Sequence, residues 1–264
     1  MLKDVWAVGD AYEAYVGRWS RRVAVGFLSW LQLPTRGRWA DIGCGTGALS
    51  AAILTQADPV ELVGVDPSEQ FLMDARARIL DPRVRFRAGD AQALPLEDRQ
   101  FTAVVSGLAI NFVPDPARAV AEFARVAAPE GVAAAYVWDY AEGMQMMRYF
   151  WDAATAIDPA AGELDELRRF AMCRPEPLRA LWTQAGLQEV AVEGIEVPTV
   201  FKDFDDYWGP FLGGQGPAPA YVKTLTDEHR DTLREQLRAS LPWAEDGSIS
   251  LTARAWAVKG INPG

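Results

Sequence analysis

The sequence predicts an α/β fold whose sheet is built mostly from parallel strands. Short apolar runs that end in an acidic residue alternate with segments whose apolar residues have helical spacing. The clearest unit spans residues 38–49, where a strand-like run passes through three alternating glycines into a helical pattern. Alternation of this kind is typical of sheets whose strands are connected by helices.

The segment Asp-Ile-Gly-Cys-Gly-Thr-Gly-Ala at residues 41–48 predicts a ligand-binding loop. Glycines permit positive φ angles and close approach of a ligand, and the amides that open the following helix can hold polar or anionic groups. Gly43, Gly45 and Ala48 also satisfy the dinucleotide pattern G-x-G-x-x-G/A. The glycines alone therefore leave a nicotinamide dinucleotide open as the ligand.

Two neighbours favour a different ligand, because Asp41 precedes the turn and Gly47 adds a third glycine. With them, the sequence resembles the class I S-adenosylmethionine-dependent methyltransferases over about residues 12–197 and the final strand. The resemblance implies a Rossmann-like fold with a seven-stranded, mostly parallel sheet, helices on both faces and helical lid insertions. It also implies that the loop with Gly43, Cys44 and Gly45 wraps the methionine and ribose of S-adenosylmethionine, with Asp41 near the ammonium group.

Two further acids follow predicted strands at residues 61–66 and 84–88. Asp66 lies about 20 residues beyond the glycines, the usual place for a carboxylate that accepts both ribose hydroxyls. By resemblance, Asp90 and the Ala91 amide bind the adenine edge, and Phe71, in the segment that Pro67 opens, lies against the adenine ring. For Phe71, packing in the core is an equally good interpretation.

The fourth and fifth predicted strands, at residues 101–106 and 132–138, end at the edge where chemistry is expected in such sheets. Ser106 and Asn111 are expected to contact the cofactor, and the Gly107-Leu108-x-x-Asn111 spelling is similar to the quinone-biosynthesis methyltransferases. An amide can orient a hydroxyl but cannot act as a base, so Asn111 is expected to position a reactant. Asp139 is the tentative base.

The remaining segments suggest a single methyltransferase domain over residues 1–264 that carries additions. Residues 1–34 form a predicted helical flap, in which Tyr15 and Trp19 are expected to cover the cofactor by resemblance. Aromatic- and methionine-rich stretches at about residues 140–172 and 198–247 predict lid insertions that line an acceptor pocket, although about half of these side chains must be core.

Composition excludes several other classes of protein. The 36 acidic residues outnumber the 26 basic ones, and a net charge of −10 repels phosphate backbones, so no nucleic-acid partner is expected. Runs of about 18 apolar residues without a charge do not occur, so we expect no membrane insertion and a cytoplasmic location. The 2 cysteines and 1 histidine have no spacing for metal ligation, and no metal is expected.

The sequence therefore predicts in-line methyl transfer from S-adenosylmethionine to a small, rather apolar acceptor. The identity of the acceptor, the atom that is methylated and the oligomeric state remain open. The alternatives are a nicotinamide-dependent oxidoreductase, suggested by Ala48, and a non-catalytic cofactor-binding interaction module, suggested by the aromatic insertions.

Overall fold

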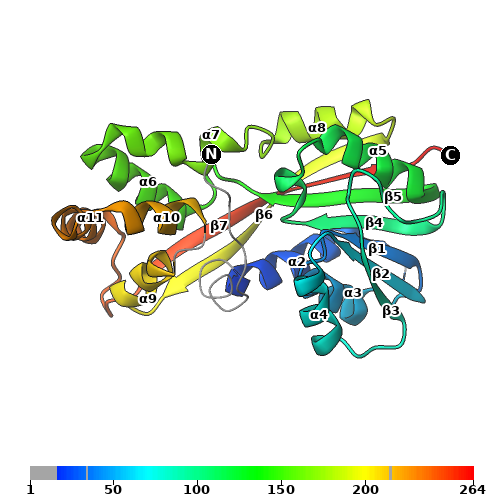
Figure 1. Ribbon diagram of the computed structural model, residues 1–264, viewed down its shortest axis with the longest axis horizontal. Coiled ribbons are helices and arrows are strands. Elements are labelled where there is room, and N and C mark those ends of the chain that lie inside the picture. The colour runs from blue at the N-terminus through cyan, green and yellow to red at the C-terminus, as the bar shows by residue number, and fades with distance from the viewer. Residues whose placement is uncertain (1–16, 34, 214–215) are drawn as a thin grey trace. The chain divides into compact units, whose positions relative to one another are not determined.

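The structure is a computed structural model that describes residues 17–33, 35–213 and 216–264 (Figure 1). Its seven-stranded sheet has the order β3-β2-β1-β4-β5-β7-β6. The four neighbouring pairs from β3 to β5 are all parallel. The predicted mostly parallel α/β fold is thus confirmed. The strands are β1 (Arg38–Ile42), β2 (Glu61–Asp66), β3 (Val84–Ala88), β4 (Phe101–Gly107), β5 (Ala127–Trp138), β6 (Gln188–Phe201) and β7 (Ile249–Ile261).

Helices cover both faces of the sheet. Figure 1 shows α5 and α8 on one face and α3 and α4 on the other. The indole of Trp182 in α8 donates a 2.8 Å hydrogen bond to the carbonyl of Ala133 in β5, which fixes this helix on the sheet. The helices, including short 3-10 turns, are α2 (Arg18–Leu31), α3 (Ala48–Gln56), α4 (Glu69–Arg78), η2 (Ile110–Phe112), α5 (Pro116–Val126), α6 (Gln145–Ile157), η3 (Pro159–Leu164), α7 (Glu166–Arg169), α8 (Pro175–Gln184), α9 (Phe204–Trp208), η4 (Gly209–Leu212), α10 (Pro217–Thr224) and α11 (Asp227–Ser240).

Local sequence explains where the helices beside the sheet begin. Ser68 caps α4 by accepting the N–H of Phe71, and Asp115 caps α5 by accepting the N–H of Arg118. Pro116 occupies the first turn of α5, where its missing N–H has no intrahelical partner to lose. Such caps stabilise a helix by about 1 kcal/mol each and place its first residues firmly after the preceding strand.

The chain divides into two compact units. The sheet unit comprises Ser20–Val137, Met172–Ile195 and Ala255–Gly264. The second unit comprises Trp138–Ala171, Glu196–Arg254 and the described residues up to Trp19. The single domain with a flap and two lid insertions stays a prediction.

Aromatic side chains form the core of the second unit. The ring of Phe150 stacks on that of Phe211 at 4.5 Å, and the Tyr207 hydroxyl donates to the carbonyl of Met146 at 2.9 Å. Trp19 packs edge-on against Phe201 at 5.7 Å. Burying a large apolar side chain contributes about 2 kcal/mol, so these aromatic residues account for much of the unit's stability.

The predicted start of the fifth strand was wrong. The sequence predicts a strand from residue 132, after the turn-like Pro-Glu-Gly at residues 129–131, whereas β5 already begins at Ala127. The pairing with β4 shifts between Phe101 and Ala103, and Glu130 has a φ of 62°. A bulge of this kind accommodates a proline without a ladder hydrogen bond, so the turn signals belong to an irregular strand.

The second unit also buries a carboxyl group. Glu166 is 3% exposed and accepts a 2.6 Å hydrogen bond from the indole N–H of Trp151. Burial raises its pKa to about 7, and Asp165 adds to this, whereas the Trp151 hydrogen bond and Arg148 oppose it. Asp165 itself accepts two 2.6 Å hydrogen bonds from Arg148. The folded protein therefore holds a proton on Glu166 over a pH range in which an unfolded glutamate has lost it.

Glu166→Gln should remove a pH-dependent part of the stability. The folded pKa lies above the unfolded value, so the wild type loses stability as the pH rises from about 4.3 to 7. At pH 8 the variant should be more stable by up to about 3–4 kcal/mol, and at pH 5 by only about 1 kcal/mol. Urea unfolding at both pH values measures this, with exposed Glu235→Gln as control. A difference that is equal at both pH values would contradict the prediction.

Candidate functional site

The loops that follow β1, β2 and β3 meet at one edge of the sheet. The N–H groups of Gly43 and Cys44 both donate to the carbonyl of Val65, at 2.7 and 3.1 Å. The N–H of Gly89 donates to the carbonyl of Asp66 at 3.1 Å. Parallel pairing places the carboxyl ends of these strands side by side, and these hydrogen bonds join the loops directly.

The three glycines of the loop have different surroundings. Gly43, Gly45 and Gly47 have φ angles of 72°, 52° and 88°, which glycine adopts without strain. A Cβ on Gly43 would lie 2.4 Å from that of Ala109, and one on Gly47 would lie 2.7 Å from Ile79 Cδ1. A Cβ on Gly45 would have no heavy atom within 4 Å. Packing thus requires Gly43 and Gly47, whereas Gly45 borders open space.

Asp66 connects the loop to the end of β2. Its Oδ2 accepts the N–H of Gly45 at 2.9 Å, and its Oδ1 accepts the N–H of Ser68 at 2.8 Å. The residue is 7% exposed, and burial raises its pKa, although both hydrogen bonds act in the opposite direction. A carboxylate has about four acceptor positions, so two remain for a ligand.

Asp41 is enclosed beneath the loop. It is 0% exposed, and its Oδ2 accepts a 2.7 Å hydrogen bond from the hydroxyl of Ser50 in α3. Its Oδ1 has no hydrogen-bond partner within the described part of the chain. Burial raises its pKa to about 7, with a smaller contribution from Asp66, while the Ser50 bond opposes the shift. The expected contact with an ammonium group stays a prediction.

The expected adenine-binding residues lie around the loop after β3 and the start of α4. Asp90 is exposed, and Gln92 donates to both of its carboxylate oxygens at 3.0 Å. Ala91 and Phe71 are half-buried, and Pro67 is exposed. These residues belong to the sheet unit, and their contacts with a nucleoside stay predictions.

The loop after β4 borders the glycine loop, because β4 pairs with β1 and Ala109 lies against Gly43. Ser106 is 1% exposed and Asn111 is 8% exposed. The Asn111 Nδ2 group has no hydrogen-bond partner among the described residues. A buried amide donor without a partner is costly, so a bound ligand or water that accepts from it would stabilise this arrangement.

The remaining predicted residues lie in the second unit or outside the described part. Asp139 is 1% exposed; its Oδ2 accepts from Arg254 at 2.8 and 2.6 Å, and its Oδ1 accepts from the N–H groups of Ala141 and Glu142. These bonds give Asp139 a structural function, and its tentative assignment as a base stays a prediction. Trp19 is buried against Phe201, and Tyr15 lies outside the described residues.

Sequence reasoning missed four partners of these acids. Ser68 and Gln92 each lie two residues after the acid that they bind, a spacing typical of local hydrogen bonds to Asp, so a signal was present. Ser50 lies in the first turn of α3, nine residues after Asp41, and Arg254 is 115 residues from Asp139 in the chain. No local pattern indicates the last pair.

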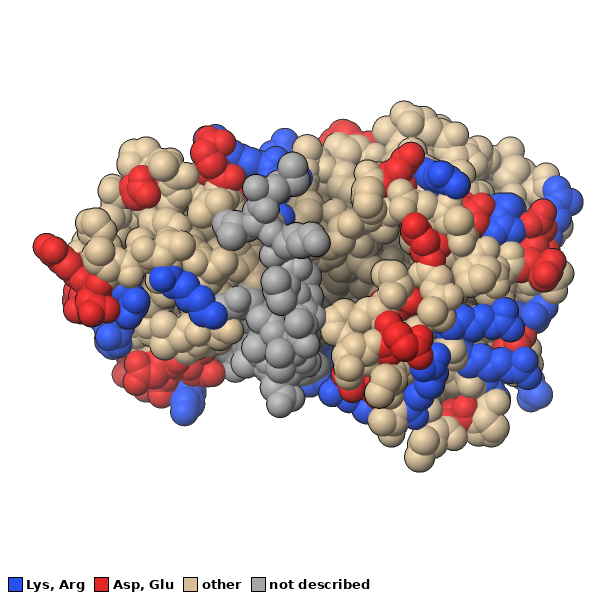
Figure 2. Space-filling view, in the orientation of Figure 1, with Lys and Arg blue, Asp and Glu red and all other residues tan. Residues whose placement is uncertain are grey.

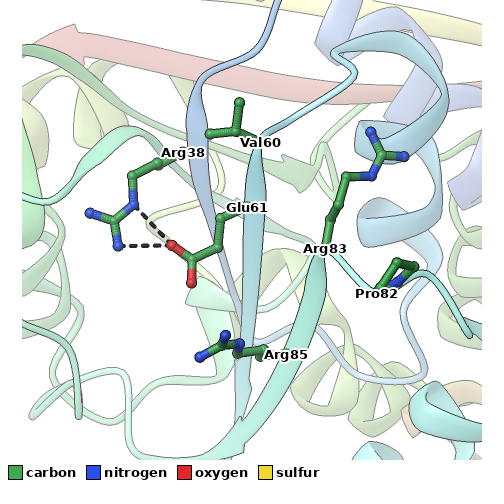
Figure 3. Close-up of a pocket in the computed structure, with 6 residues that line it drawn as sticks. All are labelled: Arg38, Val60, Glu61, Pro82, Arg83 and Arg85. Carbon is green, nitrogen blue, oxygen red and sulfur yellow. Dashed lines mark hydrogen bonds and ion pairs between the residues drawn. The ribbon is translucent and has the colours of Figure 1, made fainter.

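A pocket lies at the opposite edge, where β1, β2 and β3 begin (Figure 3). Figure 3 shows the guanidinium of Arg38 paired with the carboxylate of Glu61, at 2.8 Å. Arg83 is paired with Asp58 and Asp81. The charges of these two arginines are therefore largely offset within the protein. The residues that line the pocket are Arg38, Val60, Glu61, Pro82, Arg83 and Arg85.

The described surface carries mixed charges. On the face shown in Figure 2, basic and acidic side chains are intermingled over the sheet unit.

Within the described ranges, no helix is both long and apolar enough to cross a membrane. The same residues contain no cluster of three or more His, Cys, Asp or Glu side chains suited to a metal ion.

Comparisons with known proteins identify the central segment. Residues 40–135 match the family model described as a methyltransferase domain. A demethylmenaquinone methyltransferase of Roseiflexus castenholzii is 37% identical over 101 residues, which are 38% of this chain and 42% of the relative. A trans-aconitate 2-methyltransferase of Variovorax paradoxus is 30% identical over 149 residues, 56% of each chain. The chain thus spans about half the length of these curated relatives, or less.

The fold agrees with this result. A solved phosphoethanolamine N-methyltransferase 2 of Haemonchus contortus, in complex with phosphomonomethylethanolamine and S-adenosylhomocysteine, has a TM-score of 0.61 at 17% identity. The similarity covers 97% of this chain and 57% of that one. The matched segment contains the glycine loop and the three acids at the strand ends. Residues 40–135 are therefore a methyltransferase domain in a chain with the class I S-adenosylmethionine-dependent methyltransferase fold.

Proposed function

We propose that the protein binds S-adenosylmethionine at the carboxyl edge of β1, β2 and β3 and transfers its methyl group to a small acceptor. The observation that carries the proposal is that open space borders Gly45 and that the Asp66 carboxylate lies directly beside this glycine. The glycine clears room for a ligand, and the carboxylate offers acceptors for two hydroxyl groups. The matching methyltransferase domain spans both residues.

Each element has a proposed part in holding the cofactor. Asp66 accepts the two ribose hydroxyls through its remaining acceptor positions. Gly43, Cys44 and Gly45 line the methionine end and the ribose, and the buried Asp41 supports this loop through Ser50. The adenine edge lies at Asp90 and the Ala91 amide. Pro67, Phe71 and Ser106 complete the part of the cofactor site that the sheet unit provides; cover by the flap residues Tyr15 and Trp19 stays a prediction.

Methyl transfer needs alignment more than acid–base chemistry. When bound, S-adenosylmethionine supplies an activated methyl group on a sulfonium, so the protein has to hold the acceptor in line with it and exclude water. The unpartnered Nδ2 of Asn111 is suited to orient an acceptor oxygen or the cofactor.

We propose a small, rather apolar acceptor and no nucleic-acid substrate. The net charge of −10 disfavours nucleic acid, and one relative is named a demethylmenaquinone methyltransferase. The trans-aconitate relative shows that related sequences are also named for a small acid, so the acceptor panel has to include acids. A sequence with 2 cysteines offers no disulfide framework, which suits the proposed cytoplasmic location.

Calorimetry with S-adenosylhomocysteine tests cofactor binding. The wild type should bind, and Asp66→Ala should weaken binding by at least about 100-fold, because two hydrogen bonds to a charged group are lost. Asp231→Ala removes an exposed acid from α11 and should bind like the wild type. Equal affinities of the wild type and Asp66→Ala would contradict the proposal. Turnover on phenols, quinols, amines and carboxylic acids then separates an enzyme from a cofactor-binding module.

Gly45→Ala and Gly43→Ala should have different consequences. Both replace a glycine with positive φ, a strain of roughly 1–2 kcal/mol. Gly43→Ala also forces a contact with Ala109 and should destabilise the fold by about 1–3 kcal/mol more. Gly45→Ala should fold but bind S-adenosylhomocysteine at least about 10-fold more weakly, because its methyl group enters the ligand space. Thermal unfolding and calorimetry measure the two effects. Unchanged cofactor affinity in Gly45→Ala would mean that the ligand lies elsewhere.

A further inference from the structure

The carboxylate of Asp90 is occupied by a neighbouring side chain. The backbone N–H of Gln92 donates to Oδ1 at 2.9 Å, and the side-chain Nε2 donates to both Oδ1 and Oδ2 at 3.0 Å. These bonds lower the pKa of Asp90, the backbone bond most. The acid is therefore held as a carboxylate, an acceptor that attracts amine donors.

Gln92 is itself held at its other end. Its Oε1 accepts the N–H of Asp115 at 3.1 Å, and Asp115 caps α5 by accepting the N–H of Arg118. The carboxamide is half-buried between the loop after β3 and the start of α5. It thus has a defined resting position, with its oxygen on Asp115 and its NH₂ group on Asp90.

The NH₂ group of a carboxamide and the exocyclic amine of adenine present the same chemistry to a carboxylate. Each is a planar, neutral nitrogen that donates two hydrogen bonds. Asp90 has about four acceptor positions, and three hydrogen bonds from Gln92 already use most of them. An amine that approaches Asp90 therefore meets a carboxylate that already accepts from Gln92. The two hydrogen bonds from the Gln92 side chain can be broken by rotating that side chain, whereas the backbone bond can stay.

We propose that the side-chain NH₂ group of Gln92 occupies the position on Asp90 that the adenine amine takes in the complex. The cofactor then has to displace Gln92 from Asp90 when it binds. This inference rests on the proposed function, because it assigns the adenine edge to Asp90. Displacement exchanges the NH₂ group of Gln92 for the adenine amine on Asp90. Because the hydrogen bonds from Gln92 have to be broken first, the Gln92 side chain lowers the affinity for the cofactor. A ligand without this donor cannot replace these bonds and leaves Gln92 on Asp90, so only the binding of an amine ligand carries the cost of displacing it.

Calorimetry on the full chain tests the proposal with Gln92→Ala and Gln92→Met. Methionine keeps most of the side-chain volume and removes the donor, which guards against a loss of loop packing. Both variants should bind S-adenosylhomocysteine about 3- to 10-fold more tightly than the wild type, because a hydrogen bond to a carboxylate no longer has to be broken. Gln56→Ala, an exposed change at the end of α3, should leave affinity unchanged.

The inosine analogue of S-adenosylhomocysteine supplies the second readout. In this analogue a carbonyl oxygen replaces the exocyclic amine, so the Gln92 variants should bind the analogue no more tightly than the wild type does. The preference of the variants for S-adenosylhomocysteine over the analogue should therefore exceed that of the wild type by the same 3- to 10-fold. Unchanged or weaker binding of S-adenosylhomocysteine by both variants would overturn the displacement of Gln92 while leaving the proposed function intact. Absence of binding by the wild type itself would overturn both.

Discussion

The candidate site depends on the hydrogen bonds that gather three loops around the end of β2. Val65 accepts the N–H groups of Gly43 and Cys44, the Asp66 carboxylate accepts that of Gly45, and the Asp66 carbonyl accepts that of Gly89. A hydrogen bond to a charged group contributes about 1.5–3 kcal/mol, so the carboxylate is the strongest of these connections. It fixes the glycine loop in the conformation that leaves space beside Gly45. A ligand at this edge would therefore meet a loop that is already in place.

The three acids at the strand ends are not equivalent. Asp41 is fully buried, Asp66 is 7% exposed and Asp90 is exposed. Burial raises the pKa of the first two, whereas hydrogen bonds from Gln92 lower that of Asp90. This gradient suits one acid that supports the loop, one that binds hydroxyl groups and one that meets an amine at the rim. Desolvation thus separates functions that the sequence presents as three similar carboxylates.

Much of the sheet unit could be predicted from the sequence because its signals are local. Apolar runs ending in an acid indicated β1 and β2, and the alternation at residues 84–88 indicated β3. The start of β5 was missed because proline and glycine are turn signals that also occur in a bulge. The Asp139–Arg254 pair and the buried Glu166 depend on contacts between distant segments, which no sequence spacing records. The candidate acids were predicted because each lies at or just after the end of a strand in the parallel part of the sheet, and their binding functions stay predictions.

The most direct test of this account is a crystal structure of the protein with S-adenosylhomocysteine. We expect both ribose hydroxyls at about 3 Å from the Asp66 carboxylate, with the Gly45 and Ser68 hydrogen bonds retained and the ligand passing over Gly45. A nucleoside bound away from the carboxyl ends of β1, β2 and β3 would contradict this expectation. An Asp66 carboxylate that contacts only backbone N–H groups in the complex would contradict it equally.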